Sequence, residues 1–432
     1  MTSPLEQTLK LPCGAELPNR LCKAAMTEQI AKPGEHLPHA GHQRLYKAWG
    51  KSGCGVLLTG NVIIDRQHLE SPGNVVIDAE PDEHQLAALK AWAEAGQSDG
   101  AKMWMQISHA GRQTPKNVNA EPLAPSAVPL GLPGDNFGKP RAMTETDIRK
   151  VIEGFARCAR VAKAAGFDGV QVHAAHGYLL SQFLNPRANI REDEWGGPLE
   201  NRARLLLAVV FAVRAAVGDD FPVSVKLNSA DFQKGGFSFE ECRQVVKWLS
   251  ELKVDLLEIS GGNYEQPKLL GIDGLERAEK EPVRESTKAR EAYFVDYAGE
   301  VRGVANMPVM ATGGFRSKVA MEEALEAGLA DMIGIGAPLC TDPQGPAKML
   351  AGETDGVESY AKTLRLGPGF MGPQSKVGMI KMINALGQMA WNYMAILAIS
   401  EGRKPARSRG LLSLYMAHQK RLKEQAAALN KG

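Results

Sequence analysis

Eight apolar, β-branched runs alternate along this chain with segments of helical periodicity, and this alternation most constrains the fold. Helices are expected at residues 82–95, 145–165, 199–217, 240–252 and 318–327, the second beginning with a capping-box pattern from Thr144 to Asp147. Repeated strand–helix units of this number predict an α/β fold, a (β/α)8 TIM barrel. The eight predicted strands are residues 21–25, 56–63, 102–107, 169–173, 223–227, 256–259, 308–311 and 332–335.

Two segments are additions to a minimal barrel. Residues 113–142 are rich in proline and glycine and form an excursion after the third strand, where we expect a lid-like insertion over the mouth of the barrel. From about Asp342 onward we expect a helical chain with many methionines. The predicted domains are therefore a barrel over residues 1–350 and a helical C-terminal extension over 351–432, which packs on the barrel or on a partner subunit.

Composition narrows the class of protein. The 51 Lys and Arg residues nearly balance the 49 Asp and Glu residues, which gives no reason to expect nucleic acid or an anionic membrane as partner. Six scattered cysteines without a close pair favour a reducing compartment, and the first residues lack a secretory pattern. We therefore expect a cytoplasmic enzyme. Separately, we expect a small-molecule substrate and a homodimer or higher homo-oligomer.

The segment HAAHGY follows the fourth predicted strand and carries the strongest chemical signal. His173, His176 and Tyr178 would stand at the mouth of the barrel, where catalytic groups of this fold lie. Two imidazoles and a phenol can hydrogen-bond a substrate oxygen and transfer a proton near neutral pH. The alternative is a zinc pair, but His-x-x-His lacks a nearby cysteine or carboxylate to complete a ligand set, so no metal is predicted.

Other strand ends also carry functional signals. Gly313-Gly314 and Gly336 follow the seventh and eighth strands, where glycine-rich loops of this fold cradle phosphate. Lys226 lies inside an apolar strand and needs an acceptor, because burying an unpaired ammonium is costly. The pattern indicates a phosphorylated substrate or cofactor.

These residues resemble the Old Yellow Enzyme family of FMN-dependent ene-reductases over about residues 5 to 350. The most specific motif is HAAHGYLLSQFLNP with NIREDEWGGPLENRAR, and the supporting motifs are LPNRLCKAAMT, MQISHAGR, SVKLNSADF and MATGGFRS. The chain is most similar to the bacterial-type, thermophilic-like branch and to members called NADH oxidase or NADH:flavin oxidoreductase. The resemblance implies FMN as cofactor and NAD(P)H as hydride donor.

The resemblance also implies roles for individual residues. His173 and His176 would hold the substrate carbonyl, and Tyr178 would donate a proton to its Cα. Lys226 would lie near N1 and O2 of the flavin. The remaining cofactor-binding residues would be Ala24, Ala25, Met26, Thr27, Gly60, Gln106, Gly313, Gly314, Phe315, Gly336 and Ala337.

Two positions depart from the family pattern. Ala337 stands where an arginine usually grips the phosphate, so backbone amides or another cation such as Arg316 must take its place. Gln29, expected to contact substrate, stands where the bacterial branch often has tyrosine. No cysteine follows Cys340, so the iron–sulfur cluster of the larger dienoyl-CoA-reducing relatives is not expected.

The resemblance favours NAD(P)H-dependent reduction of activated C=C bonds in enones, enals, maleimides and nitroalkenes by a ping-pong mechanism. An NAD(P)H oxidase, a quinone reductase or a flavin-dependent isomerase on the same fold remains an alternative. A metal-dependent lyase or hydrolase that uses His173 and His176 as ligands is a third.

Overall fold

Eight parallel strands form a closed barrel in the computed structural model, which describes residues 3–132, 135–265, 292 and 294–429. The strands pair in chain order, and the barrel closes because the last strand pairs with the first, which also pairs with the second. This confirms the (β/α)8 barrel. Its strands are β3 (Leu21–Lys23), β4 (Val56–Ile63), β6 (Lys102–Ser108), β9 (Gly169–Ala174), β10 (Val223–Asn228), β11 (Leu256–Ser260), β12 (Val309–Thr312) and β13 (Met332–Ile335).

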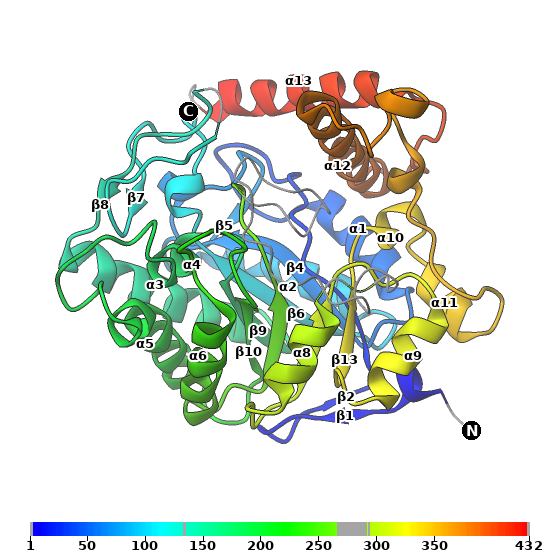
Figure 1. The fold of residues 1–432 in the computed structure, drawn as a ribbon. Coiled ribbons are helices and arrows are strands. Elements are labelled where there is room, and N and C mark those ends of the chain that lie inside the picture. Colours follow the sequence, from blue (N-terminus) through cyan, green and yellow to red (C-terminus); the bar gives the residue numbers. More distant parts are fainter. Residues whose placement is uncertain (1–2, 133–134, 266–291, 293, 430–432) are drawn as a thin grey trace.

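Helices surround the barrel, as Figure 1 shows. All five helices expected from the sequence are present with ends shifted by no more than two residues, because apolar periodicity and caps are local signals. Thr144 and Asp147 form the expected capping box of the second one. The helices that follow the strands are α1 (Ala40–Gly50), α2 (Glu83–Gln97), α3 (Glu145–Ala164), α4 (Leu179–Leu184), α5 (Leu199–Val217), α6 (Phe239–Glu251), α8 (Val295–Arg302), α9 (Lys318–Glu326), α10 (Pro338–Thr341) and α11 (Gly345–Leu350).

An N-terminal hairpin covers one end of the barrel. Its strands β1 (Leu9–Lys10) and β2 (Glu16–Leu17) lie at the end opposite the C-terminal helices in Figure 1. Leu11 and Leu17 join Trp104 and Met310 in an apolar cluster that is separate from the main core. This end is packed with side chains, so the functional groups are confined to the other end.

The excursion after β6 forms a small structured unit. It contains the parallel pair β7 (Leu123–Ala124) and β8 (Arg141–Ala142), and two of its residues, 133 and 134, lie outside the described part of the chain. Arg112 anchors it by hydrogen bonds to the carbonyl oxygens of Val128 and Pro129 and by an ion pair with Glu265 at 2.9 Å. A further strand, β5 (Val75–Val76), extends the sheet beside β4.

The C-terminal region is less helical than the sequence suggests. Residues 351–377 contain only short 3-10 turns, because Gly367-Pro368-Gly369 and Gly372-Pro373 interrupt a helix. Two long helices follow, α12 (Gly378–Ser400) and α13 (Leu411–Leu429).

Helix α13 lies across the same end of the molecule as the excursion (Figure 1). Arg421 and Gln425 donate hydrogen bonds to the carbonyl oxygen of Gln29 at 2.6 and 3.0 Å, and His418 bonds its side-chain oxygen at 2.9 Å. Residues far apart in sequence therefore meet directly beyond β3. Among the described helices, none is both long enough and apolar enough to cross a bilayer.

Candidate active site

His173, His176 and Tyr178 come together where β9 ends and α4 begins. His173 is a β9 residue, and Tyr178 is the N-cap of α4. His176 between them has a φ of 60°, in the left-handed region that ordinary side chains rarely adopt. Its N–H donates to Oδ1 of Asn228 at 3.1 Å, and it forms a bridge with Asn263, so the neighbouring strands hold this conformation.

The two histidine rings are perpendicular, and each uses one nitrogen internally. Their centroids lie 5.2 Å apart at an interplanar angle of 85°. Nδ1 of His173 accepts the Ala175 N–H at 3.2 Å, while Nε2 of His176 is 2.7 Å from Oγ of Ser260. Within the described residues, Nε2 of His173 and Nδ1 of His176 carry no other hydrogen bond, so both are available to a ligand.

The surroundings keep the histidines neutral and the tyrosine protonated. Burial, with His176 and Lys226 nearby, holds the pKa of His173 well below its ordinary value, and burial with Lys226 does the same for His176. Burial, together with Tyr264 and Glu70, raises the pKa of Tyr178. These directions favour the neutral form of all three groups at pH 7, and each neutral group has a proton that it can donate.

Two groups beside Tyr178 were not anticipated from the sequence. The hydroxyl groups of Tyr178 and Tyr264 are 3.0 Å apart. Glu70, after β4, accepts a hydrogen bond from Asn74 at 3.4 Å and one from Thr27. Burial raises the pKa of Glu70 to about 7, and hydrogen bonding offsets part of this effect. Tyr264 and Glu70 each lie in an irregular segment, and a single residue there carries no sequence signal that it will lie beside Tyr178.

Lys226 finds its acceptor inside the barrel. Its Nζ lies 2.9 Å from Oε1 of Glu258, and both side chains are at most 4% exposed. Glu258 also accepts from Gln171, which in turn accepts from Gln106 at 2.7 Å. The sequence did contain a signal for this pair, because Glu258 is a charged residue in an apolar strand and is the direct register partner of Lys226.

The segment after β3 runs along the inside of the mouth. Ala25, Met26 and Thr27 are half-buried, and Ala24 donates its N–H to the carbonyl of Ile335 at 2.9 Å. A Cβ at Gly60 would lie 2.3 Å from Oε2 of Glu28 and 2.6 Å from the Met26 carbonyl. Only glycine therefore fits at this point, where β4 approaches the segment most closely.

The ends of β12 and β13 expose backbone suited to a phosphate group. Gly313 and Gly314 have φ values of 124° and 87°, and Oγ1 of Thr312 is buried without a partner in the described chain. Phe315 is buried, while Gly336 and Ala337 lead into α10. Lys362 lies close enough to Arg316 for the Arg316 charge, after burial, to lower the pKa of Lys362.

Gln29 does not point freely into the mouth. It is buried, has a φ of 56° and is bound by α13 through both of its oxygen atoms. The structure thus places it between the segment after β3 and the C-terminal extension.

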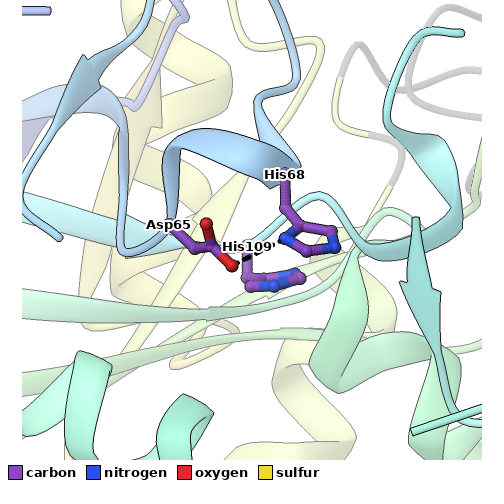
Figure 2. A group of neighbouring side chains, drawn as sticks. All are labelled: Asp65, His68 and His109. Atoms are coloured by element: carbon purple, nitrogen blue, oxygen red, sulfur yellow. Dashed lines mark hydrogen bonds and ion pairs between the residues drawn. The ribbon is translucent and has the colours of Figure 1, made fainter. Parts of the chain in front are cut away.

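A second histidine pair lies on the flank of the barrel (Figure 2). Asp65, His68 and His109 each offer an atom within 4.8 Å of the others, beside a cavity of about 490 Å³. Nδ1 of His68 is 2.8 Å from the Asp65 carboxylate, and its Nε2 accepts the Leu123 N–H at 2.9 Å. Nδ1 of His109 accepts the Gly111 N–H at 3.0 Å.

This second pair is poorly suited to holding a metal. The rings are stacked, with centroids 4.3 Å apart and an interplanar angle of 25°, so their in-plane lone pairs cannot converge on one ion. Because Nε2 of His68 and Nδ1 of His109 accept backbone hydrogen bonds, the remaining nitrogens carry protons. Asp65 and His68 instead tie the excursion at Leu123 to the loop after β4.

The comparisons with known proteins agree with the barrel. Residues 9–355 match the model of the NADH:flavin oxidoreductase / NADH oxidase family. The chain belongs to this family. It is 37% identical over 359 residues to the NADH-dependent flavin oxidoreductase iccE of Talaromyces variabilis, covering 79% of this chain and 85% of that protein.

Two further relatives complete the comparison. The chain is 38% identical over 354 residues to the NADH-dependent flavin oxidoreductase iliE of Neonectria sp., covering 78% of this chain but only 46% of that longer protein. A solved Old Yellow Enzyme homologue from Zymomonas mobilis superimposes with a TM-score of 0.67 at 25% identity, covering 82% of this chain and 94% of the other. The chain is therefore an Old Yellow Enzyme-family oxidoreductase with FMN as cofactor and a nicotinamide hydride donor.

The residues of the mouth fit FMN. Glycine at position 60 lets β4 approach the segment after β3 closely, the interior presents Gln106 and Lys226, and the backbone at Gly313 and Gly314 has no Cβ to keep a phosphate away. This combination matches the parts of FMN in order, from its ring to its phosphate.

Proposed function

We propose that this oxidoreductase reduces activated C=C bonds, in enones, enals, maleimides and nitroalkenes, at the expense of NADH or NADPH. The redox chemistry, which is acceptance of a hydride from the nicotinamide and its delivery to the alkene in two separate half-reactions, is supplied by FMN when bound. The observation that carries the proposal is the pair of free ring nitrogens, Nε2 of His173 and Nδ1 of His176, beside the Tyr178 hydroxyl.

The histidines bind and polarise the substrate. Two neutral N–H donors that converge on a carbonyl or nitro oxygen stabilise the negative charge that develops there as the alkene accepts a hydride. Their perpendicular rings approach one oxygen from two directions. Hydrogen bonds hold the ring of His173 and both the backbone and the ring of His176, so these side chains need little reorganisation during the reaction.

Tyr178 supplies the proton. Its raised pKa keeps the phenol protonated at pH 7, and its ring lies 4.9 Å from that of His173. Protonation of Cα by this hydroxyl would complete the addition across the double bond. Tyr264, 3.0 Å away, can hydrogen-bond the phenolate that remains until solvent restores the proton.

The proposed cofactor contacts follow the same surface. Gln106 and Lys226 would face the pyrimidine edge, with Glu258 balancing the lysine charge. The segment 24–27 and Gly60 would bound the ring, and Gly313, Gly314, Phe315, Gly336 and Ala337 would surround the phosphate. Because Ala337 provides no charge, we assign the compensating positive charge to Arg316 and Lys362.

We also propose that the barrel and the C-terminal extension have different roles. Residues 1–350 would hold FMN, while 351–432 would shape the substrate entrance, since α13 binds Gln29 two residues after Thr27. In this proposal Gln29 would influence substrate access through its position beside α13, and assembly into a homo-oligomer would leave each mouth complete.

Separate measurement of the two half-reactions tests the proposal. In anaerobic stopped-flow experiments, NADH or NADPH should bleach the flavin, and 2-cyclohexenone or a maleimide should restore its colour. Tyr178→Phe should slow reoxidation by about 10²–10⁴-fold and leave bleaching nearly unchanged, because only the second step needs a proton on carbon. Reoxidation by oxygen or quinones but by no alkene would instead assign an oxidase or quinone reductase.

A further inference from the structure

Ser260 is the hydrogen-bond partner of one ring nitrogen of His176. This residue ends β11, is completely buried, and lies 84 positions after His176 in the sequence. Its hydroxyl oxygen is 2.7 Å from Nε2 of His176 and has no other hydrogen-bond partner among the described residues. The contact leaves Nδ1 of His176 as the nitrogen that faces the mouth.

Two arrangements of protons are compatible with this distance. If Nε2 of His176 carries the proton and donates to Ser260, the buried Ser260 hydroxyl has no acceptor, and an unsatisfied buried donor is unfavourable. The Nδ1 atom is then a bare acceptor and would repel a carbonyl oxygen. If Ser260 donates to Nε2 instead, both donors are used, because Nδ1–H of the half-exposed His176 can reach ligand or water.

We infer that Ser260 is a positioning residue that holds His176 in the Nδ1–H tautomer, so that this ring and His173 both donate to the substrate oxygen. The inference rests on the proposed function for the identity of that substrate. The backbone at Ala175 has the matching role for the partner ring, because its N–H occupies Nδ1 of His173 and leaves Nε2–H free.

The surroundings of both rings favour the neutral imidazole. The ionisable or charged neighbours that act on the two rings are His173, His176 and Lys226, and burial is the main reason both imidazoles resist protonation. Lys226 is itself paired with Glu258 on the strand that ends in Ser260. A neutral ring has a choice of tautomer, and the serine hydroxyl decides it.

The test observes the tautomer directly. Holoenzyme labelled with ¹⁵N-histidine should show the one-bond proton on Nδ1 of His176 and an unprotonated Nε2, assigned by comparison with His176→Gln. Ser260→Ala should move that proton to Nε2, whereas Ser260→Thr should retain it on Nδ1. A wild-type proton on Nε2, or an unchanged tautomer in Ser260→Ala, overturns the inference.

A binding measurement provides the second readout. Oxidised holoenzyme titrated with 2-cyclohexenone, followed by flavin absorbance, should bind about tenfold more weakly in Ser260→Ala, which corresponds to loss of one neutral hydrogen bond, and Ser260→Thr should restore most of the affinity. Ser229→Ala is the matched control, since Ser229 is an equally buried neighbour whose hydroxyl has no partner in the described chain. Equal weakening in Ser229→Ala and Ser260→Ala would overturn the inference.

The two ideas fail separately. If no alkene reoxidises the flavin but His176 carries its proton on Nδ1, the proposed ene-reduction is wrong and the tautomer assignment holds. If alkenes are reduced while the proton lies on Nε2 of His176, the proposed ene-reduction holds and the tautomer assignment is wrong. If Ser260→Ala does not fold, the wild-type and Ser260→Thr spectra still decide the question.

Discussion

Two histidine pairs lie in or after strands of this barrel, one at the mouth and one on the flank, and they are built in opposite ways. His173 and His176 are perpendicular, and each keeps one ring nitrogen free at the mouth. His68 and His109 are nearly parallel, and three of their four nitrogens are engaged, by Asp65, Leu123 and Gly111. The same residue type thus serves ligand binding in one place and loop anchoring in the other.

The difference lies in the partners of each ring and not in burial. His68, His109 and His173 are each less than 5% exposed, and His176 is partly buried, so buried rings occur in both pairs. What distinguishes the pairs is the direction of the remaining lone pairs and protons, which is set by backbone amides and by single side chains such as Ser260 and Asp65. Histidine density alone therefore does not locate the site.

Replacing a histidine by alanine should lower the reaction rate in one pair and the stability of the fold in the other. The loss of rate is the largest effect that we expect. His173→Ala should lower the rate of alkene reduction by about 10²–10³-fold, because one preorganised donor is lost. His109→Ala should leave that rate close to wild type but destabilise the fold by about 2–4 kcal/mol, because a fully buried ring is removed. Stopped-flow reoxidation and chemical denaturation measure the two effects, and equal rate losses would abolish the distinction.

The acids beside the two pairs should give opposite pH dependences of stability. Glu70, near Tyr178, has a pKa raised to about 7, mainly by burial. The folded state therefore retains a proton that the unfolded state has lost, and stability falls as pH rises from about 4.5 to 7. Glu70→Gln should remove this fall and be more stable than wild type at pH 8, by about 1–2 kcal/mol, and close to it at pH 4.5.

Thermal denaturation of both proteins across this pH range measures the effect of Glu70. Glu153→Gln is a suitable control, because Glu153 is exposed on α3 and shows no such burial. A constant difference between wild type and Glu70→Gln at all pH values would mean that the carboxyl group does not titrate in this window.

Asp65 should give the smallest effect, with the opposite sign. Burial alone would raise the pKa of Asp65, but the hydrogen bond that its carboxylate accepts from His68 lowers this pKa below its ordinary value. Its contribution is present above the unfolded pKa near 4 and is lost as pH falls through the folded pKa. Asp65→Asn should cost about 1 kcal/mol at pH 7, because 38% of the Asp65 side chain is exposed, and less at acid pH.

Chemical denaturation at pH 7 and pH 3 checks this last prediction. Asp78→Asn is the matched control, since Asp78 pairs with the half-exposed Arg66 and touches neither ring. If Asp65→Asn also reduced alkene turnover strongly, the flank cluster would belong to the active site, and the contrast between the pairs would be lost.

Much of the barrel was predictable from local patterns. Two of the eight strands, β4 and β13, have the bounds expected from the sequence, and the helix α5 does too. The extension differed, because glycine and proline between 367 and 373 delay the helices until Gly378. Apolar periodicity and caps work well here because they depend on residues within one element.

The site was predictable only in part. The motif at 173–178 indicated which side chains meet at the mouth, since strand ends of a parallel barrel converge there. It could not reveal Tyr264 beside Tyr178, Glu258 beneath Lys226 or α13 over Gln29, because these partners are 86, 32 and about 390 residues away in the chain. The Lys226–Glu258 pair could have been predicted, because each is a charged residue in an apolar strand. The contacts of Tyr264 and of α13 leave no such pattern in the sequence.

The sequence by itself determined the barrel, the family and the residue types at its mouth, because periodicity, turn residues and motifs are written in neighbouring positions. Only the tertiary structure decided which partner each histidine ring nitrogen has, and our inference about the tautomer of His176 rests on that partner. A tautomer depends on the hydrogen-bond partner of the other ring nitrogen, and for His176 that partner is a serine on a strand two places away in the sheet. Folding of the chain brings His176 and Ser260 into contact, and no local sequence pattern predicts this contact.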